Sequence, residues 1–212
     1  SITTNSPMQV TEHSNGFVSV TGKPADCVYL GIHELSPWQP DLVISGVNLG
    51  ANMGEDLLYS GTVGAALEAA GLDYPSIAIS AAAFHQPGSK DHMEPNYTTA
   101  AKVVLDILKN YKLETIDPSL VLNINTPNIE FSDDLEYKFT TIGSWGFRNP
   151  PHIIEDDEGT KTYWTTHRDL YPDNDEQSDI FTLEKNMVSI SPIYPNFSIK
   201  EVLNGSFTIE KK

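Results

Sequence analysis

Short apolar runs and helical repeats of apolar residues alternate along the first 127 residues. The runs show no polar alternation, as expected for strands buried on both faces of a sheet, and they occupy 42–45, 76–80 and 120–125. Apolar residues return with helical spacing at 61–70 and, most clearly, at 100–111. The pattern predicts an α/β fold with a parallel crossover over 42–80.

Two elements are predicted ahead of these strands. A short strand is expected at 16–20, and a helix is expected from Pro24 to about Leu35 because proline is tolerated at the first helical position. This helix contains Cys27, which we expect to be a small buried side chain rather than a nucleophile. A single cysteine cannot form an internal disulfide, which favours a reducing compartment such as the cytoplasm.

The pattern changes after residue 127, where segments become short, polar and β-like. We expect strands at 138–142, 160–165 and 187–193, and a short final helix at 198–203. Two acidic runs, at 155–158 and 173–176, are expected to be solvated loops. We therefore predict two parts, which are an α/β core over 1–127 and a β-rich extension over 128–212 that forms an oligomerisation arm and returns a strand near 187–193.

The charge of the chain narrows the classes of partner. With 13 basic and 29 acidic side chains the formal net charge is −16, which should repel nucleic-acid backbones and anionic membranes. No apolar run is long enough to span a membrane. A small phosphate ester remains a possible ligand, because a local nest of backbone N–H groups can outweigh a distant net charge.

The segment that carries candidate chemistry follows the apolar run at 42–45. Residues 45–54 read Ser-Gly-Val-Asn-Leu-Gly-Ala-Asn-Met-Gly, in which glycines that allow positive φ alternate with asparagines. Open α/β sheets place ligands beyond the C-terminal ends of their strands, where this loop lies. Ser60-Gly61-Thr62 then begins the next helix, and free N–H groups at a helix start bind anions. We interpret 45–62 as a phosphate-binding loop. The α/β core over 1–127 is therefore predicted to bind phosphate.

Other interpretations of these residues are weaker. Ser60 could serve only as a helix cap and the glycines only as a tight connection, but that does not explain the interleaved asparagines. The loop lacks the Gly-Lys-Ser/Thr ending of a Walker A motif, and its glycines do not have the dinucleotide spacing. The histidines form no metal-binding pair on a helix face, and they are His13, His33, His85, His92, His152 and His167.

At these residues the sequence resembles the SurE family of survival-protein nucleotidases. The central motif of that family is similar to residues 40–48, 50–54 and 59–63. Residues 22–28 resemble the family's Gly-Thr-Pro-x-Asp-Cys-Val segment, with Lys23 in place of the threonine. Residues 122–127 resemble its Leu-Asn-x-Asn-x-Pro strand end, and residues 188–193 its late Val-Ser-Ile-Thr-Pro strand.

The resemblance implies a Rossmann-like, three-layer α/β core with a mostly parallel sheet, followed by a C-terminal β-hairpin arm. It implies a phosphatase that requires a divalent metal, Mg²⁺ or Mn²⁺, and removes phosphate from nucleoside monophosphates (a 5'/3'-nucleotidase). It also implies a homodimer or homotetramer with exchanged C-terminal arms. By position, Asn48 matches a metal ligand, and the phosphate-contacting residues are matched by Asn52, Ser60, Gly61 and Thr62.

One departure from the family concerns the metal. The family opens with a strand ending in Asn-Asp-Asp-Gly, whose two aspartates hold the metal, and residues 1–212 contain no such segment. We expect this pair ahead of Ser1. We also expect residues 1–212 alone to hydrolyse little, because one Asn48 carbonyl cannot hold Mg²⁺ against its water shell. The alternative is a catalytically silent phosphate- or nucleotide-binding module of the same fold, while the Asn/Gly loop argues against a scaffold without a small ligand.

Overall fold

The computed structural model describes residues 2–83, 94–110, 112, 117–146, 150–164 and 173–195. Its helical elements are α1 (Pro24–Leu30), the π-helical turn η1 (Gly31–Leu35), the 3-10 segment η2 (Gly54–Tyr59), α2 (Gly61–Gly71), α3 (Tyr97–Asn110) and α4 (Asp179–Glu184). Its strands are β1 (Val10–Glu12), β2 (Val18–Val20), β3 (Val43–Leu49), β4 (Ser76–Ala81), β5 (Val121–Thr126), β6 (Tyr137–Phe139), β7 (His152–Glu155), β8 (Lys161–Trp164) and β9 (Val188–Ile193).

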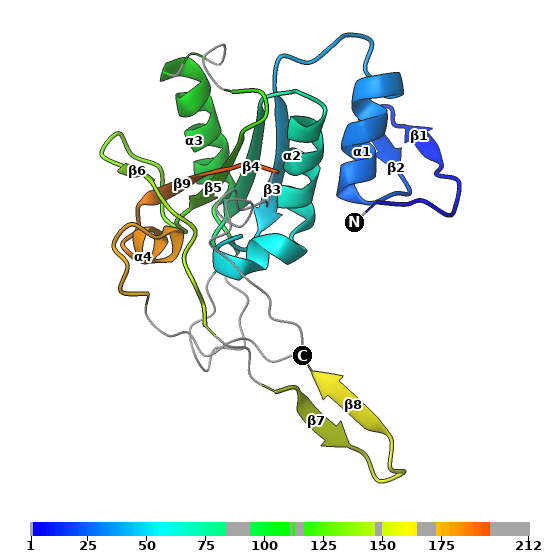
Figure 1. Ribbon diagram of the computed structural model, residues 1–212, viewed down its shortest axis with the longest axis vertical. Helices are drawn as coiled ribbons and strands as arrows, with labels where there is room; N and C mark the ends of the chain where they lie inside the picture. The colour runs from blue at the N-terminus through cyan, green and yellow to red at the C-terminus, as the bar shows by residue number, and fades with distance from the viewer. Residues whose placement is uncertain are drawn as a thin grey trace, which may run out of the picture.

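A five-stranded sheet in the order β3-β4-β5-β9-β6 forms the centre of the molecule (Figure 1). Strands β3, β4 and β5 run parallel, β9 is antiparallel to β5, and β6 is parallel to β9. Helices flank this mostly parallel sheet, which confirms the predicted Rossmann-like α/β fold class. The predicted parallel crossover is also present, since α2 connects β3 to its neighbour β4.

Helices cover both faces of the central sheet (Figure 1). On one face, Ile79, Ile124 and Ile190 from three neighbouring strands share a buried cluster with α3. On the other face, α2 packs Val63 and other small residues against the sheet. Side chains alternate between the faces of a strand, so β4 and β5, covered on both faces, are buried at every position as predicted.

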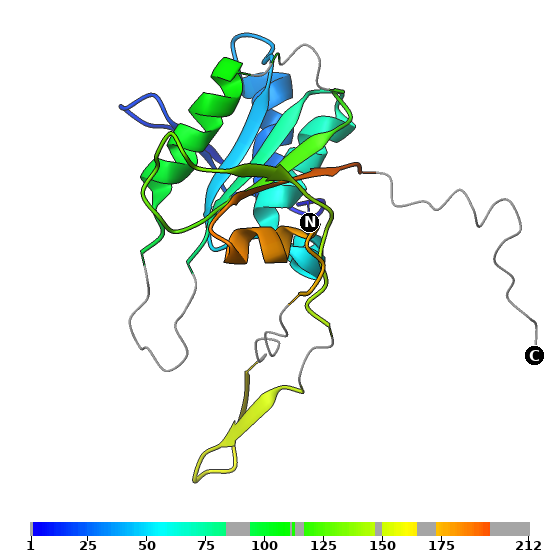
Figure 2. The same cartoon turned by 90° about the vertical axis from the view of Figure 1, so that its left-hand side faces the viewer.

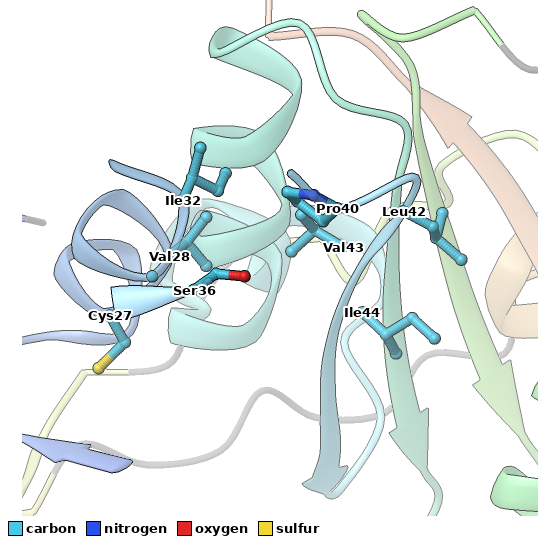
Figure 3. A pocket seen from close by; sticks show the side chains of 9 residues that line it. Cys27, Val28, Ile32, Ser36, Pro40, Leu42, Val43 and Ile44 are labelled. Atoms are coloured by element: carbon cyan, nitrogen blue, oxygen red, sulfur yellow. The ribbon is translucent and has the colours of Figure 1, made fainter. Parts of the chain in front are cut away.

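The expectation that residues 42–45 are buried on both faces is wrong. β3 is the edge strand of the described sheet, and the side chains of Ile44 and Leu49 are 44% and 63% exposed. A groove of about 360 Å³ separates α1 from this strand, as Figure 3 shows, and most of its lining is apolar, including Val28, Ile32 and Val43. Its lining contains no carboxylate or histidine that could act as a general acid or base.

The expectation that Cys27 is buried is also wrong. The thiol is free and exposed, and in Figure 3 it points away from β3. The reason is that α1 packs mainly on α2 and leaves its opposite side open to solvent. The helix itself begins at Pro24, as predicted, and its last turn continues as the π-helical turn that ends at Leu35.

The second half of the chain contributes both to the sheet and to a separate hairpin. β9 lies between β5 and β6, near the predicted position, whereas β7 and β8 form a two-stranded ribbon that extends away from the sheet (Figure 2). The acidic run at 155–158 is exposed, as predicted. The helix predicted at 198–203 lies outside the described residues. Within the described part, none of the helices is long and apolar enough to cross a membrane.

Candidate functional site

Strand β3 is irregular where it reaches the predicted phosphate loop. Ser45 pairs with Ala78, and Asn48 pairs with Ser80, so three residue steps on β3 face two on β4. An extra residue of this kind is a β-bulge, which re-aims the side chains that follow it and often lies beside a functional site. The bulge is therefore what places Asn48 opposite Ser80 at the C-terminal end of β3.

Glycine is required inside this bulge. Gly46 has a φ of 130°, and a Cβ at this position would overlap the carbonyl oxygen of Ile79 on the neighbouring strand. A residue with a side chain would be strained by its φ and would also collide with backbone that cannot move away. The first glycine of the predicted loop therefore permits the close contact between β3 and β4 on which the position of Asn48 depends.

The side chain of Asn48 is oriented by its own loop. Its Nδ2 group donates to the carbonyl oxygens of Leu49 and Gly50, at 3.1 and 2.8 Å. These bonds use both hydrogens of the amide, while the described residues supply no hydrogen bond to Oδ1. Asn48 thus presents a neutral carbonyl oxygen, which is the type of ligand that Mg²⁺ accepts.

Asn52 is held more tightly and lies deeper. It is 7% exposed, and its Nδ2 donates to the Ser80 hydroxyl at 2.7 Å. Its backbone N–H donates to Oδ1 of Asn125, and its carbonyl accepts hydrogen bonds from Asn123 and Asn125. Ser80 therefore connects the two predicted asparagines, because Asn48 faces it across the strand pair and Asn52 bonds to it.

The start of α2 has the free N–H groups that the sequence predicts. Ser60 caps the helix, since its Oγ accepts from the N–H of Val63 at 3.1 Å and its carbonyl accepts from Gly64. Within the described part of the chain, the N–H groups of Gly61 and Thr62 have no acceptor. The helix dipole adds partial positive charge at this end, so the two groups form an anion-binding position.

The beginning of α1 lies against the beginning of α2. The ring of Pro24 would be 3.1 Å from a Cβ at Gly61, so the missing side chain allows the two helix starts to approach. Asp26 of α1 is buried and accepts hydrogen bonds from Thr3 and from the N–H of Lys23. The bonds from Thr3 hold the pKa of the Asp26 carboxyl below its ordinary value, and they fix Thr3 beside the start of α1.

A second set of contacts fixes the far end of the phosphate loop. The indole of Trp145 donates to the carbonyl of Met53 at 3.1 Å, and the backbone N–H of Trp145 donates to the carboxylate of Glu55 at 3.0 Å. Gly54 has a φ of 52°, and a Cβ there would be 2.8 Å from the indole ring. The loop 52–55 is therefore packed directly against the segment around Trp145.

Asp179 links the phosphate loop to the segment around Trp145 by further hydrogen bonds. Its carboxylate accepts backbone N–H bonds from Gly54 at 3.2 Å, from Gly143 at 2.8 Å and from Ile180 at 2.9 Å. Burial raises the pKa of the Asp179 carboxyl above its ordinary value, against the opposing effect of these N–H groups, and the charge of Asp173 raises it further. Asp179 is thus a buried carboxylate that links the phosphate loop to the second half of the chain.

Several of these residues were given no role at the site from the sequence. Ser80, Asn123 and Asn125 are polar residues inside otherwise apolar strands, and that contrast could have identified them as candidates. Asp179 gave no comparable indication, because it stands in a polar stretch of the second half of the chain.

The described residues do not form a complete metal site by themselves. Asn48 supplies one suitable oxygen, but no group of three or more His, Cys, Asp or Glu side chains in the described part could hold a metal ion. The groups that the structure brings together instead suit an anion, since they are free backbone N–H groups at the start of α2 and side-chain amides in the preceding loop.

Comparison with known proteins gives concordant results. The family model described as "Survival protein SurE" matches residues 1–149. A protein named "5'-nucleotidase SurE" from Coxiella burnetii is 34% identical over 193 residues, covering 91% of this chain and 72% of that protein. The protein of the same name from Kosmotoga olearia is 38% identical over 187 residues, covering 88% of this chain and 70% of that protein.

A solved structure also matches most of the chain. The crystal structure of the SurE protein from Aquifex aeolicus superposes with a TM-score of 0.79 at 32% sequence identity. The match covers 97% of this chain and 81% of that chain.

Proposed function

Since the chain belongs to the SurE family, we propose that it is a phosphatase that hydrolyses nucleoside monophosphates. The observation that carries the proposal is the pair of free N–H groups of Gly61 and Thr62 at the start of α2, which follows the Asn48–Asn52 loop. The relatives from Coxiella burnetii and Kosmotoga olearia are named 5'-nucleotidases, which supports the same substrate class.

The residues of this chain would act chiefly on the phosphate group. The N–H groups of Gly61 and Thr62 would bind phosphoryl oxygens, and the dipole of α2 would stabilise the charge that develops on them during transfer. The Thr62 hydroxyl and the second hydrogen of the Asn52 Nδ2 group are further donors for these oxygens. Ser60 would hold the helix start in place through its cap to Val63.

We propose Mg²⁺ or Mn²⁺ as the metal and Asn48 as one of its ligands. A hard cation prefers oxygen ligands, and the Asn48 carbonyl oxygen is the part of that side chain which its loop leaves available. When bound, such a metal polarises the phosphoryl group and activates water. The resemblance assigns the remaining carboxylate ligands to an Asp pair that residues 1–212 do not contain, so we expect little hydrolysis from residues 1–212 alone.

The assembly, the compartment and the division of the chain are further proposals. The β7–β8 ribbon exposes Ile153, Ile154 and Tyr163, and an isolated two-stranded ribbon is at best marginally stable in water. We propose that residues 128–212 include an arm that pairs with a second copy in a homodimer or homotetramer, beside a core at 1–127. The single cysteine is compatible with the cytoplasm.

The function is tested by assaying phosphate release from AMP with Mg²⁺ or Mn²⁺, and again after addition of EDTA. The assay uses the protein purified from its source in parallel with residues 1–212. We expect the source protein to release phosphate only with metal, and Asn48→Ala and Ser60→Ala to reduce the rate, whereas the exposed control Asn110→Ala does not. Activity that survives EDTA would contradict metal dependence, and an inactive source protein that binds phosphate would favour the silent binding module.

A further inference from the structure

Two asparagines on strand β5 hold the backbone N–H and carbonyl of one residue of the phosphate loop, Asn52. Oδ1 of Asn125 accepts the N–H of Asn52 at 2.8 Å, and Nδ2 of Asn125 donates to the carbonyl of Asn52 at 2.9 Å. Nδ2 of Asn123 donates to the same carbonyl at 3.0 Å. Both asparagines are fully buried, and they follow Asn52 in the chain by 71 and 73 positions.

The direction of these side-chain amides follows from the backbone that they bind. A backbone N–H can only donate and a carbonyl can only accept, so Asn125 must present its oxygen to the first and its nitrogen to the second. Asn123 must likewise direct its nitrogen to the carbonyl of Asn52. A rotation of either amide by 180° would place two donors or two acceptors face to face. Each side-chain amide can therefore adopt only one orientation.

Asn123 makes this contact at a cost to stability. Its Oδ1 is buried and has no hydrogen-bond partner in the described part of the chain. An unpaired buried acceptor is destabilising, and an apolar side chain of similar size would avoid the loss. The presence of asparagine at this position is explained by what its other end does, which is to fix the Asn52 carbonyl.

The loop ahead of Asn52 has further attachments to strand β4. The N–H of Gly50 donates to the carbonyl of Ala81 at 2.9 Å, and Asn52 donates to Ser80. With Asn48 paired opposite Ser80, the loop is fixed at its start, middle and end. Only the attachment at Asn52 depends on side chains from β5.

We propose that Asn123 and Asn125 are positioning residues, which set the distance and orientation of the Asn48–Asn52 loop for phosphate binding. The proposal rests on the proposed phosphatase function. Neither asparagine is a catalytic residue, because each acts through the backbone of Asn52. Misplacing a binding group by about 1 Å can cost roughly 100-fold in rate, so loss of this attachment should weaken ligand binding without altering the fold.

The test uses the source protein with inorganic phosphate as the probe. Phosphate affinity is measured by calorimetry, and thermal stability is measured in parallel for wild type, Asn125→Ala, Asn123→Leu and the exposed control Asn110→Ala. Asn123→Leu separates the two roles, because it removes the unpaired Oδ1 together with the bond to Asn52. The kinetic parameters with AMP are measured for the same proteins.

We expect Asn125→Ala and Asn123→Leu each to weaken phosphate affinity by about tenfold or more, with KM raised more than kcat is lowered. Asn123→Leu should do so at an unchanged or higher melting temperature, which a purely structural role would not produce. Unchanged phosphate affinity in Asn123→Leu, with wild-type binding intact, would overturn the positioning role. A wild-type protein that binds no phosphate would overturn the proposed function itself and this inference with it.

Discussion

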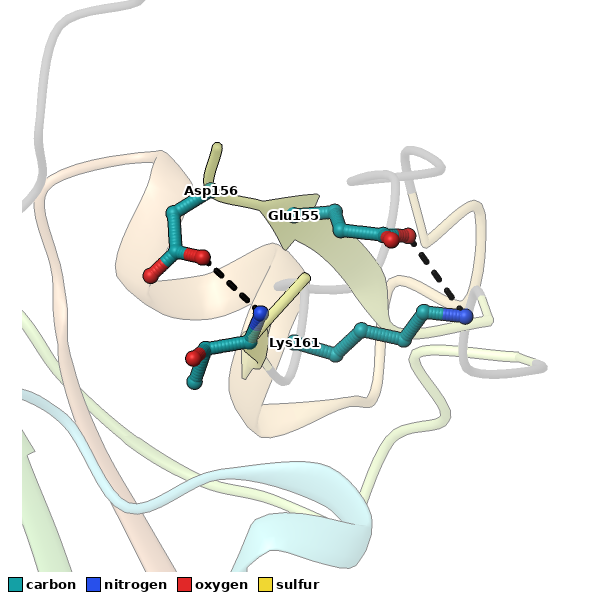
Figure 4. A network of polar contacts seen from close by, with 4 residues as sticks. Glu155, Asp156 and Lys161 are labelled. Atoms are coloured by element: carbon teal, nitrogen blue, oxygen red, sulfur yellow. Dashed lines mark hydrogen bonds and ion pairs between the residues drawn. The ribbon is translucent and has the colours of Figure 1, made fainter. Parts of the chain in front are cut away.

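Two clusters of polar side chains in this protein differ in how strongly their hydrogen bonds fix the local backbone. Around Asn52, amides from β5 and the hydroxyl of Ser80 meet in a fully buried position. At the tip of the β7–β8 ribbon, Lys161 pairs with Glu155 at 3.5 Å, and Asp156 accepts the N–H of Thr160 at 2.8 Å (Figure 4). The side chains of Lys161 and Glu155 are 49% and 55% exposed.

The two clusters differ in whether water can replace a hydrogen-bond partner that is lost. A group at the ribbon tip that loses its partner bonds to water at once, so its contribution to stability is small. A group near Asn52 has no water to replace a lost partner, so its arrangement is strongly determined. The buried cluster can therefore hold a loop in one geometry, whereas the exposed one mainly shapes a turn.

The largest effect is expected for Gly46→Ala, which places a Cβ against the carbonyl of Ile79 at a positive φ. We expect the free energy of unfolding to fall by roughly 3 kcal/mol, because backbone strain and overpacking act together. Urea unfolding measures this. The matched control is Gly31→Ala, where a helical φ and open space allow unchanged or increased stability. A similar stability for both variants would show that β3 and β4 are not in close contact at the bulge.

The next effect concerns the pH dependence of stability through Asp179. Its pKa is raised in the native state, so between pH 3.8 and that higher value the folded protein retains a proton that the unfolded chain has lost. The free energy of unfolding should therefore fall as the pH rises through this window.

Asp179→Asn has no proton to lose, so this part of the fall should vanish in urea midpoints measured across the window. Asp133→Asn, at an exposed position, should keep the wild-type profile. If Asp179→Asn also keeps the wild-type profile, the buried carboxylate is not the source of the pH dependence.

A smaller effect is expected for Ser60→Ala, which removes the cap of α2. The N–H of Val63 loses its acceptor, and a lost N-cap costs about 1 kcal/mol. Ser60→Asn, which can cap the helix equally well, should restore most of this stability in thermal unfolding. The account is contradicted if alanine and asparagine have the same melting temperature.

The smallest effect is expected for Lys161→Met at the ribbon tip. The exposed ion pair with Glu155 should contribute less than about 0.5 kcal/mol, and high salt should reduce even that. Urea unfolding at low and high salt measures it. A loss as large as that in Gly46→Ala would mean that the ribbon is buried in an assembly, and the contrast between the clusters would no longer hold.

Much of the fold follows from the sequence, because apolar periodicity reports which faces of an element are covered. The helix at 61–70 and the buried strands at 76–80 and 120–125 were predicted on that basis, and the structure confirms them. The edge position of β3 was not predictable, since an apolar run does not reveal how many neighbours a strand has.

The site could be predicted only in part. Ser60 and the free N–H groups after it follow from local rules for helix starts, and the structure contains them. The hydrogen bonds from Asn123 and Asn125 to Asn52 could not be predicted. They join residues more than 70 positions apart, which the order of strands in the sheet brings together. The assignments of Asn48 to metal and of Asn52, Gly61 and Thr62 to phosphate remain predictions.

The most direct measurement is a titration of the isotopically labelled protein with inorganic phosphate, followed through the backbone amide resonances. The account predicts saturable shifts at Gly61 and Thr62, the two residues with free N–H groups at the start of α2, and weaker shifts at Asn52. Shifts spread over the surface without saturation, or a saturable response confined to residues outside 45–62, would contradict the assignment of this loop as the phosphate site.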